Sequence, residues 1–137
     1  MNFTDDFSLN ECDNKLLKYV NEIGYFLIAL FRDKKLTLLE CRVLAIFYVV
    51  YGENNVYLKK TTSDELCEYL DTTPKSFSTV LSNLYRKKLL YRRAYSVYRI
   101  ILNFSIELKE DFDFDVITIK NEKETITFAV NRTITNE

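Results

Sequence analysis

The sequence contains no histidine and no tryptophan, and only two glycines and one proline occur among its 137 residues. Without histidine, the chain lacks the side chain that most often serves as a general base near neutral pH. Glycine at only two positions, 24 and 52, excludes a glycine-rich phosphate-binding loop. The three cysteines lack Cys-x-x-Cys spacing, so neither a disulfide framework nor a zinc site is expected. We therefore predict a protein that is not an enzyme and that uses no cofactor or metal.

Long apolar runs are also missing. The run at 23–31 is much too short to cross a bilayer, and the acidic N-terminus, with Asp5 and Asp6, does not resemble a signal peptide. Abundant Asn, Lys, Ile, Tyr and Phe are typical of an AT-rich genome, such as that of a low-GC bacterium or a virus. We expect no membrane contact and a cytoplasmic location, which for a viral protein means the host cytoplasm or the virion.

The length and the 47% apolar content are sufficient for one compact domain with its own core. The patterning predicts an α+β fold in three regions. These are an N-terminal helical arm at 1–35, a central domain at 36–103 and an acidic β extension at 104–137.

The arm has the pattern of an amphipathic helix. Ser8 and Glu11 are spaced as a capping box. Apolar residues then recur at helical spacing at Leu16, Val20, Ile23, Leu27 and Leu30. Such a helix either serves for dimerisation or docking, or packs on the core of its own domain.

A second helix is predicted at 38–51. Thr37 and Glu40 form a capping box before it, and Gly52 is a natural residue to end it. The helix is apolar nearly all round, which indicates a central, buried position.

Two short helices and two strands follow at 61–101. Thr62 and Glu65 form a further capping box, Thr73 is a predicted N-cap, and Pro74 suits the first position of a helix at 74–88. One face of that helix is apolar, with Phe77, Val80, Leu81 and Leu84. The opposite face is polar and presents groups that hydrogen-bond to base edges or phosphates: Lys75, Ser76, Ser78, Thr79, Ser82, Asn83, Arg86 and Lys87.

Charge is segregated along the chain. No acidic residue occurs between Asp71 and Glu107, whereas seven basic residues do. That interval therefore carries +7 and the remainder −8, although the whole chain carries only −1. A segregated basic region is what binding to a phosphate backbone requires. The alternative is a solvated face on a domain that serves only as a scaffold.

Strands are predicted at 56–58, 89–93 and 95–102. The connection near Ala94 lacks the Gly, Asn or Asp residues that tight hairpins favour. Tyr91, Tyr95 and Tyr98 lie among the arginines of these strands. Such aromatic residues either stack on bases or, more commonly, cover a half-buried sheet.

This order of elements, together with the capping residues and the basic interval, resembles the winged helix-turn-helix family over residues 36–103. Within that family the MarR-like DNA-binding regulators are the most similar. The resemblance implies that the helix at 74–88 is a recognition helix that enters the major groove. It also implies base contacts by Lys75, Ser76, Ser78, Thr79, Ser82 and Asn83, and phosphate contacts by Arg86, Lys87, Arg92 and Arg93. Such regulators usually dimerise through flanking helices, of which this chain offers only the N-terminal one.

The acidic extension follows a strand pattern. Strict alternation at 98–108 predicts a strand that continues beyond 102, and the alternation at 111–115 predicts a solvated acidic strand rather than a cation-binding loop. A hairpin is predicted from strands at 116–120 and 125–130. The excess of acidic residues should repel nucleic acid. The extension is therefore either a contact surface for another protein, through an exposed sheet edge, or a small sheet packed on its own domain.

Two functions from different classes fit these patterns. The first is a small protein that binds double-stranded DNA, as a transcription regulator. The second is a structural or assembly subunit, for example of a virus particle, that uses the winged helix as a packing module. The near-zero net charge and the acidic extension favour the second. The expected partners are double-stranded DNA and, through the N-terminal helix and the β extension, a second copy or another protein.

Overall fold

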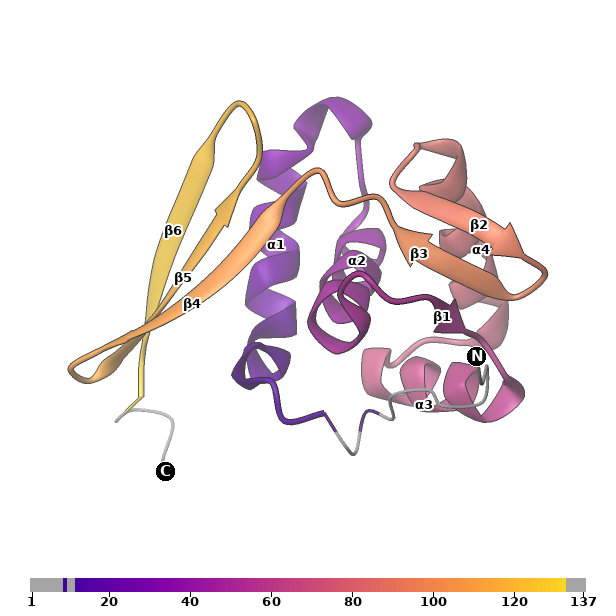
Figure 1. The fold of residues 1–137 in the computed structure, drawn as a ribbon, viewed down its shortest axis with the longest axis horizontal. Coiled ribbons are helices and arrows are strands. Elements are labelled where there is room, and N and C mark those ends of the chain that lie inside the picture. Colours follow the sequence, from indigo (N-terminus) through magenta and orange to yellow (C-terminus); the bar gives the residue numbers. More distant parts are fainter. Residues whose placement is uncertain (1–8, 10–11, 133–137) are drawn as a thin grey trace.

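The computed structural model describes residues 9 and 12–132 of the chain. It is an α+β protein, as the sequence predicts, in which helices lie beside two antiparallel three-stranded sheets (Figure 1). Within the described residues, no helix has the length and apolarity that crossing a bilayer requires. In chain order the elements are a 3-10 helix Lys15–Tyr19, α1 Val20–Leu30, a 3-10 helix Arg32–Lys34, α2 Leu38–Tyr51, β1 Val56–Tyr57, α3 Lys60–Leu70, α4 Pro74–Arg86, β2 Leu90–Ala94, β3 Val97–Ile100, β4 Ser105–Asp111, β5 Phe114–Lys120 and β6 Thr125–Asn131.

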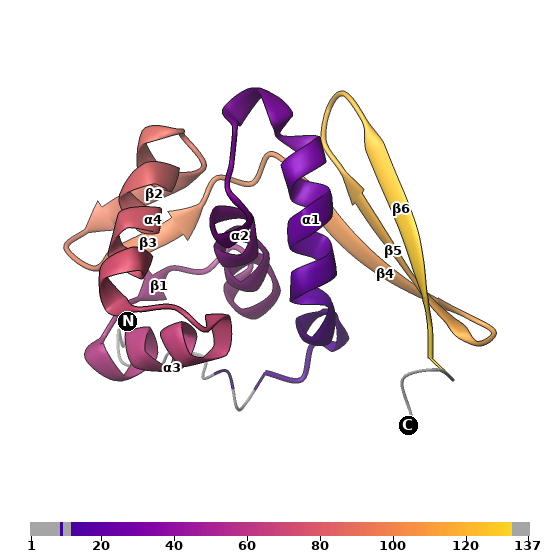
Figure 2. The same ribbon diagram turned by 180° about the vertical axis from the view of Figure 1, so that it is seen from behind.

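Helix α2 lies at the centre of the molecule, and most of its side chains are buried (Figure 2). Thr37 and Glu40 form the predicted capping box. The Thr37 hydroxyl accepts the Glu40 N–H at 3.1 Å, and the Glu40 carboxylate accepts the Thr37 N–H at 3.0 Å. Gly52 ends the helix with a φ of 56°, a conformation that residues with a Cβ rarely adopt. Both predicted boundaries of this helix are therefore confirmed.

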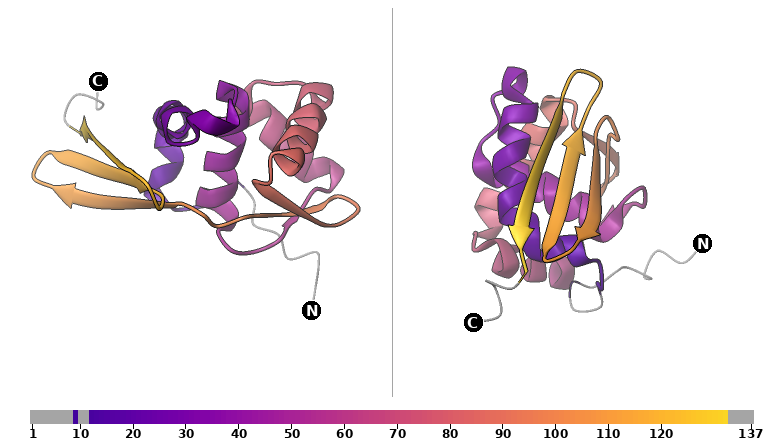
Figure 3. Two further views of the ribbon diagram at one scale, coloured as in Figure 1. Left: turned by 90° about the horizontal axis from the view of Figure 1, so that it is seen from above. Right: turned by 90° about the vertical axis from the view of Figure 1, so that its left-hand side faces the viewer.

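Helix α1 lies between α2 and the second sheet (Figures 2 and 3). Its predicted apolar stripe is buried, and Phe26 stacks on Phe128 of β6 with ring centroids 4.4 Å apart. Of the two alternatives for this helix, docking to another protein or packing on its own domain, the structure shows the second. One cluster of buried side chains continues through all three predicted regions. The capping box predicted at Ser8 and Glu11 lies outside the described residues.

Helix α3 begins earlier than its capping pattern predicts. The capping box of Thr62 and Glu65 is not formed, because Lys59 is the N-cap and Thr62 is buried in the first turn. Thr62, Leu66 and Leu70 are spaced by four residues and therefore share one helix face. Burial of that face draws Thr62 into the core and moves the start of the helix toward the N-terminus.

The first sheet has the order β1-β3-β2. Val56 pairs with Tyr98, so the predicted short strand does join the later strand pair. The prediction that β3 continues through residue 108 is wrong, since β3 ends at Ile100 and residues 101–104 form an irregular crossing to the second sheet. Phe104 anchors this crossing between Phe31 and Tyr48, with ring centroids 5.5 Å and 5.3 Å away.

The second sheet has the order β4-β5-β6, in which β5 and β6 form the predicted C-terminal hairpin and β4 adds a third strand. The acidic strand predicted at 111–115 is instead a tight turn, in which Phe112 has a φ of 49°. The pairs Asp111–Phe114 and Glu110–Asp115 flank this turn. Apolar and acidic residues alternate through the turn as they would in a single strand, which is why the sequence pattern resembled one. The two-residue turn nevertheless changes the inward-facing residues from even-numbered in β4 to odd-numbered in β5.

Asp115 corrects the prediction of a solvated acidic face. It is 1% exposed, accepts a hydrogen bond from the Tyr19 hydroxyl and pairs with Arg132 at 2.7 Å. The Tyr19 hydrogen bond, supported by Arg132 and Lys18, holds the pKa of Asp115 below its ordinary value, although burial alone would raise it. Arg132 also donates to the carbonyl oxygens of Phe112 and Phe114, which ties the β4–β5 turn to the end of β6.

Candidate nucleic-acid interface

Helix α4 separates apolar from polar side chains along its length. Thr73 caps its start by accepting the Ser76 N–H at 3.1 Å, and Pro74 occupies the first turn, as predicted. The four predicted apolar residues are all buried. The opposite face is therefore fixed toward solvent, and it exposes Lys75, Ser76, Ser78, Thr79, Ser82 and Arg86.

The hairpin of β2 and β3 lies beside α4 (Figures 1 and 2). A groove of about 300 Å³ separates the two and is lined by Ser78 and Ser82 of α4 and by Arg92 and Tyr95 of the hairpin. Arg92 reaches the groove because it lies on the same side of β2 as Leu90, which is buried. The structure thus brings together residues of the predicted recognition helix and of the strand pair predicted at 89–102.

Lys87, for which the resemblance implies a phosphate contact, is paired with a carboxylate of its own chain. Its ammonium donates to the Glu40 carboxylate at 2.9 Å and to the Lys35 carbonyl oxygen at 3.2 Å. Burial favours a raised pKa for Glu40, but the hydrogen bonds from the Thr37 backbone, Lys87 and Asn83 outweigh it and lower the pKa. Lys87 therefore joins the end of α4 to the start of α2 instead of projecting from the polar face.

Asn83 likewise uses part of its hydrogen-bonding capacity within the chain, which leaves less of it for a contact with DNA bases. Its amide oxygen accepts a hydrogen bond from Arg86, and its side chain also hydrogen-bonds to Glu40. The Thr79 hydroxyl donates to the Lys75 carbonyl at 3.1 Å within the helix. The side chains of Lys75, Ser78 and Ser82 thus form the most open part of the polar face.

Arg93 is exposed at a bulge in β2, where no residue of β3 opposes it. Arg99 of β3 lies over the ring of Tyr91 at 5.3 Å from the centroid, next to it in the sheet register. The stacking on Tyr91 fixes the guanidinium group of Arg99 on the surface of the hairpin. Arg93 and Arg99 extend the basic surface beyond the groove.

Tyr95 and Ser96 form the hairpin turn, and both line the groove. Ser96 supplies a φ of 60°, a role that the sequence did not reveal because turn residues with positive φ are usually Gly or Asn. Tyr95 is 85% exposed, so it does not cover the sheet as the more common interpretation of these tyrosines assumed. A tyrosine at the expected hairpin tip, among arginines, was the signal available in the sequence.

The acidic part of the chain lies at the far end of the molecule from α4 (Figure 1). Strand β4 exposes Glu107, Glu110 and Asp111 on the second sheet, whereas the interval between Asp71 and Glu107 contains no carboxylate side chain. The separation seen in the sequence is therefore also a separation in space.

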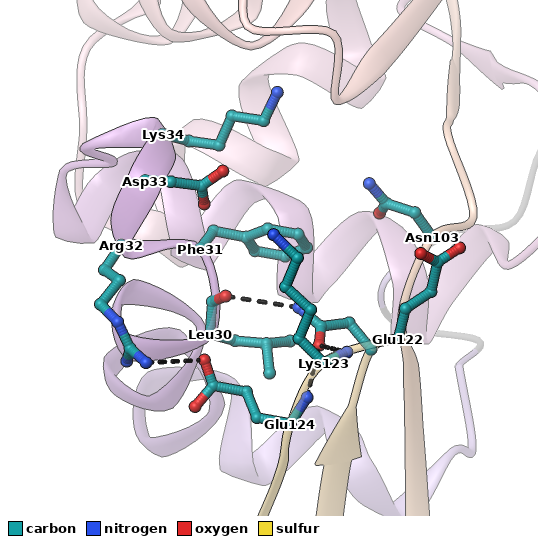
Figure 4. Close-up of a pocket in the computed structure, with 10 residues that line it drawn as sticks. Leu30, Phe31, Arg32, Asp33, Lys34, Asn103, Glu122, Lys123 and Glu124 are labelled. Carbon is teal, nitrogen blue, oxygen red and sulfur yellow. Dashed lines mark hydrogen bonds and ion pairs between the residues drawn. The ribbon is translucent and has the colours of Figure 1, made fainter.

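A second hollow, of about 450 Å³, lies where the end of α1 meets the β5–β6 turn (Figure 4). The hollow is lined by both acidic and basic side chains, and some of them are paired: the Arg32 guanidinium lies 3.1 Å from the Glu124 carboxylate. Asn121 donates to the Leu30 carbonyl oxygen at 3.4 Å and accepts the backbone N–H groups of Lys123 and Glu124. These contacts build the turn and present no concentrated charge to a ligand.

Groups of side chains that could hold a metal are absent from the described part of the chain, where no three His, Cys, Asp or Glu residues come together. The three cysteines carry free thiols, and burial raises the pKa of the Cys41 thiol to about 12.

Comparisons with protein-family models, curated proteins and solved structures found no match.

Proposed function

We propose that residues 36–103 form a winged helix-turn-helix module that binds double-stranded DNA and acts as a transcription regulator. The observation that carries this proposal is the groove between α4 and the β2–β3 hairpin. There an exposed polar helix face and Arg92 lie side by side in a segment without acidic residues.

The order of the elements supports the proposal. Helices α2, α3 and α4 precede a strand pair that completes the sheet β1-β3-β2, and Asp71 turns the chain between α3 and α4 with a φ of 54°. In helix-turn-helix proteins the second helix of such a pair lies in the major groove. Helix α4 is the second helix of the pair here, and its exposed side chains are mostly polar.

The geometry divides the proposed contacts into two groups. Lys75, Ser76, Ser78, Thr79 and Ser82 face the bases, with Asn83 at the edge of this group. Arg86, Arg92 and Arg93 contact phosphates, which fix the register but carry no sequence information. Lys87 serves to position α4 on α2. The proposed activity is binding without catalysis.

The test is a titration of the full chain into labelled duplex DNA, followed by fluorescence anisotropy at several salt concentrations. Arg92→Ala and Lys75→Ala should both weaken binding. For Arg92→Ala, which removes a proposed phosphate contact, the slope of log K against log salt should also fall by about 0.9. Lys109→Ala is the matched control, because Lys109 is exposed on β4 at the acidic end. Parent-like affinity of both Arg92→Ala and Lys75→Ala would refute the assignment of this face.

An assembly subunit is the second candidate, and one observation favours it. Strand β6 forms an uncharged edge of the second sheet, at the end opposite α4. In this case the module of residues 36–103 packs on proteins, and duplex DNA does not bind even at low salt. The same titration separates the two candidates.

A further inference from the structure

Strand β6 has the features of a pairing edge. Among the described residues it pairs only with β5, and its seven residues, Thr-Ile-Thr-Phe-Ala-Val-Asn, include no charge and no proline. Natural proteins usually protect an edge strand with charges, prolines, bulges or a covering element. None of the first three is present in β6.

The other edge of the same sheet is protected. Strand β4 contains Glu107, Lys109, Glu110 and Asp111. In addition, the Tyr48 hydroxyl of α2 accepts the backbone N–H of Ile106 at 3.1 Å, so the chain itself covers part of this edge. The contrast between the two edges singles out β6.

The backbone register shows which groups of β6 point outward. The Asn121 N–H donates to the Glu124 carbonyl and the Arg132 N–H donates to the Asp113 carbonyl, which fixes the even-numbered residues of β6 as those bonded to β5. The backbone N–H and C=O groups of Thr125, Thr127 and Ala129 therefore point away from the sheet. They form a template for a further antiparallel strand.

The apolar side chains at this edge are incompletely covered. Ile117 and Ile119 of β5 are fully buried, whereas Ile126, Phe128 and Val130 of β6 are only partly buried on the same sheet face. Helix α1 lies along this edge (Figure 3), and its Tyr25 is 61% exposed next to Phe26, which stacks on Phe128. In the part of the chain that the structure describes, the core thus reaches the β6 edge, where α1 covers it only in part.

We propose that a second copy of this chain pairs with β6, so that the two sheets join into one six-stranded sheet. An antiparallel pairing centred on Thr127 is self-complementary: Thr127 faces its own copy and Thr125 faces Ala129. Ile126 and Phe128 then lie opposite each other and cover each other's exposed surface. The absence of charge makes this edge suited to its own copy, because no like charges meet across the two-fold axis.

The dimer is independent of the proposed DNA contact. Strand β6 and α4 lie at opposite ends of the molecule, so pairing through β6 leaves both copies of the α4 face open (Figure 1). Failure of one proposal therefore leaves the other intact. DNA binding is tested with variants of α4 and β2, and dimerisation is tested with variants of β5 and β6.

The test is the molar mass of the full chain by light scattering after size exclusion, over a series of concentrations. We expect the mass to rise toward twice the chain mass of 16.3 kDa for the parent. Thr127→Lys should remain monomeric at every concentration. In the dimer the two lysines would be directly opposite each other, with their Cα atoms about 5.5 Å apart, and their ammonium groups would repel.

Thr118→Lys is the matched control. Thr118 lies beside Thr127 on the outer face, with hydroxyls 3.3 Å apart, so either variant removes the same side-chain hydrogen bond and adds the same charge. In the dimer the two lysines at 118 would be three strand spacings apart, about 14 Å, beyond the screening length of about 8–10 Å. Thr118→Lys should therefore dimerise as the parent does.

A parent that stays monomeric, or a Thr127→Lys variant as dimeric as the parent, would overturn the proposal. Hydrogen exchange of the parent provides a readout that needs no variant. The amides of Thr125, Thr127 and Ala129 should gain protection as the concentration rises, while those of the β4 edge should not. Exchange at these three amides that does not change with concentration would also overturn the proposal.

Discussion

Replacing Lys87 by Met tests whether this residue positions α4 or contacts DNA. The variant keeps the length of the side chain but removes the ammonium, which lies 2.9 Å from the Glu40 carboxylate. The Glu40 side chain is 2% exposed and that of Lys87 is 30% exposed. Glu40 would retain the hydrogen bonds from Thr37 and Asn83 but would no longer have the ammonium that balances its charge.

The expected destabilisation follows from this geometry. Breaking a buried ion pair costs about 3–5 kcal/mol, and a hydrogen bond to a charged group contributes about 1.5–3 kcal/mol. Because Lys87 is nearly one-third exposed, water replaces part of the interaction, and we expect Lys87→Met to lower the free energy of unfolding by about 2–3 kcal/mol. Urea denaturation followed by circular dichroism at pH 7 measures this decrease.

The effect should also depend on pH. The pKa of Glu40 is lower in the folded state than in the unfolded state, so its contribution is present above the unfolded pKa and is lost as the pH falls through the folded pKa. The difference between Lys87→Met and the parent should therefore shrink on acidification. The double variant Glu40→Gln with Lys87→Met should be destabilised by less than the sum of the single variants, because the two changes remove one interaction.

Lys88→Met is the control, since Lys88 is the exposed neighbour and its substitution should stay within about 0.5 kcal/mol of the parent. Under conditions where Lys87→Met is folded, its affinity for duplex DNA should match that of the parent. A Lys87→Met variant with parent stability but weakened DNA binding would refute our reasoning, because it would place the ammonium on the DNA.

Three further predictions concern the rest of the fold. Asp115→Asn should lower the thermal midpoint, because Arg132 is left without its buried carboxylate; an unchanged midpoint would contradict this. Tyr19 has a pKa raised to about 12 by burial and by Asp115, so stability should decline as pH rises from 10 to 12, and Tyr19→Phe should abolish that part of the decline in pH-dependent unfolding. Gly52→Ala should cost about 1–3 kcal/mol in urea unfolding from backbone strain alone, because a Cβ would meet no atom closer than 3.9 Å.

The helix boundaries set by local chemistry could be predicted from the sequence. Thr37 with Glu40, Gly52, and Thr73 with Pro74 act through atoms within a few residues of one another, so a short pattern contains all the information. The alternating strands β5 and β6 were predictable for the same reason. The start of α3 was not, because burial of Thr62 depends on packing against distant residues.

The candidate site was predictable as a set of residues but not as an arrangement. Periodicity places Lys75, Ser78 and Ser82 on one polar face, and the structure brings the two serines beside Arg92. No local pattern indicates that Lys87 binds Glu40, which lies 47 residues earlier. The turn at Phe112 was likewise hidden, because apolar and acidic residues alternate through it as they would in a strand and no Gly or Asn marks it.

The place of α1 between α2 and the second sheet has a consequence for biosynthesis. The Tyr19–Asp115 hydrogen bond joins residues 96 apart, and the Leu30–Asn121 hydrogen bond joins residues 91 apart. Translation proceeds at about 5–20 residues per second. Several seconds therefore pass between the synthesis of α1 and the synthesis of β5 and β6, which cover it. Nascent chains therefore display an apolar helix face that chaperones can bind. A chain that ended before β5 would lack the strands that cover this face of α1.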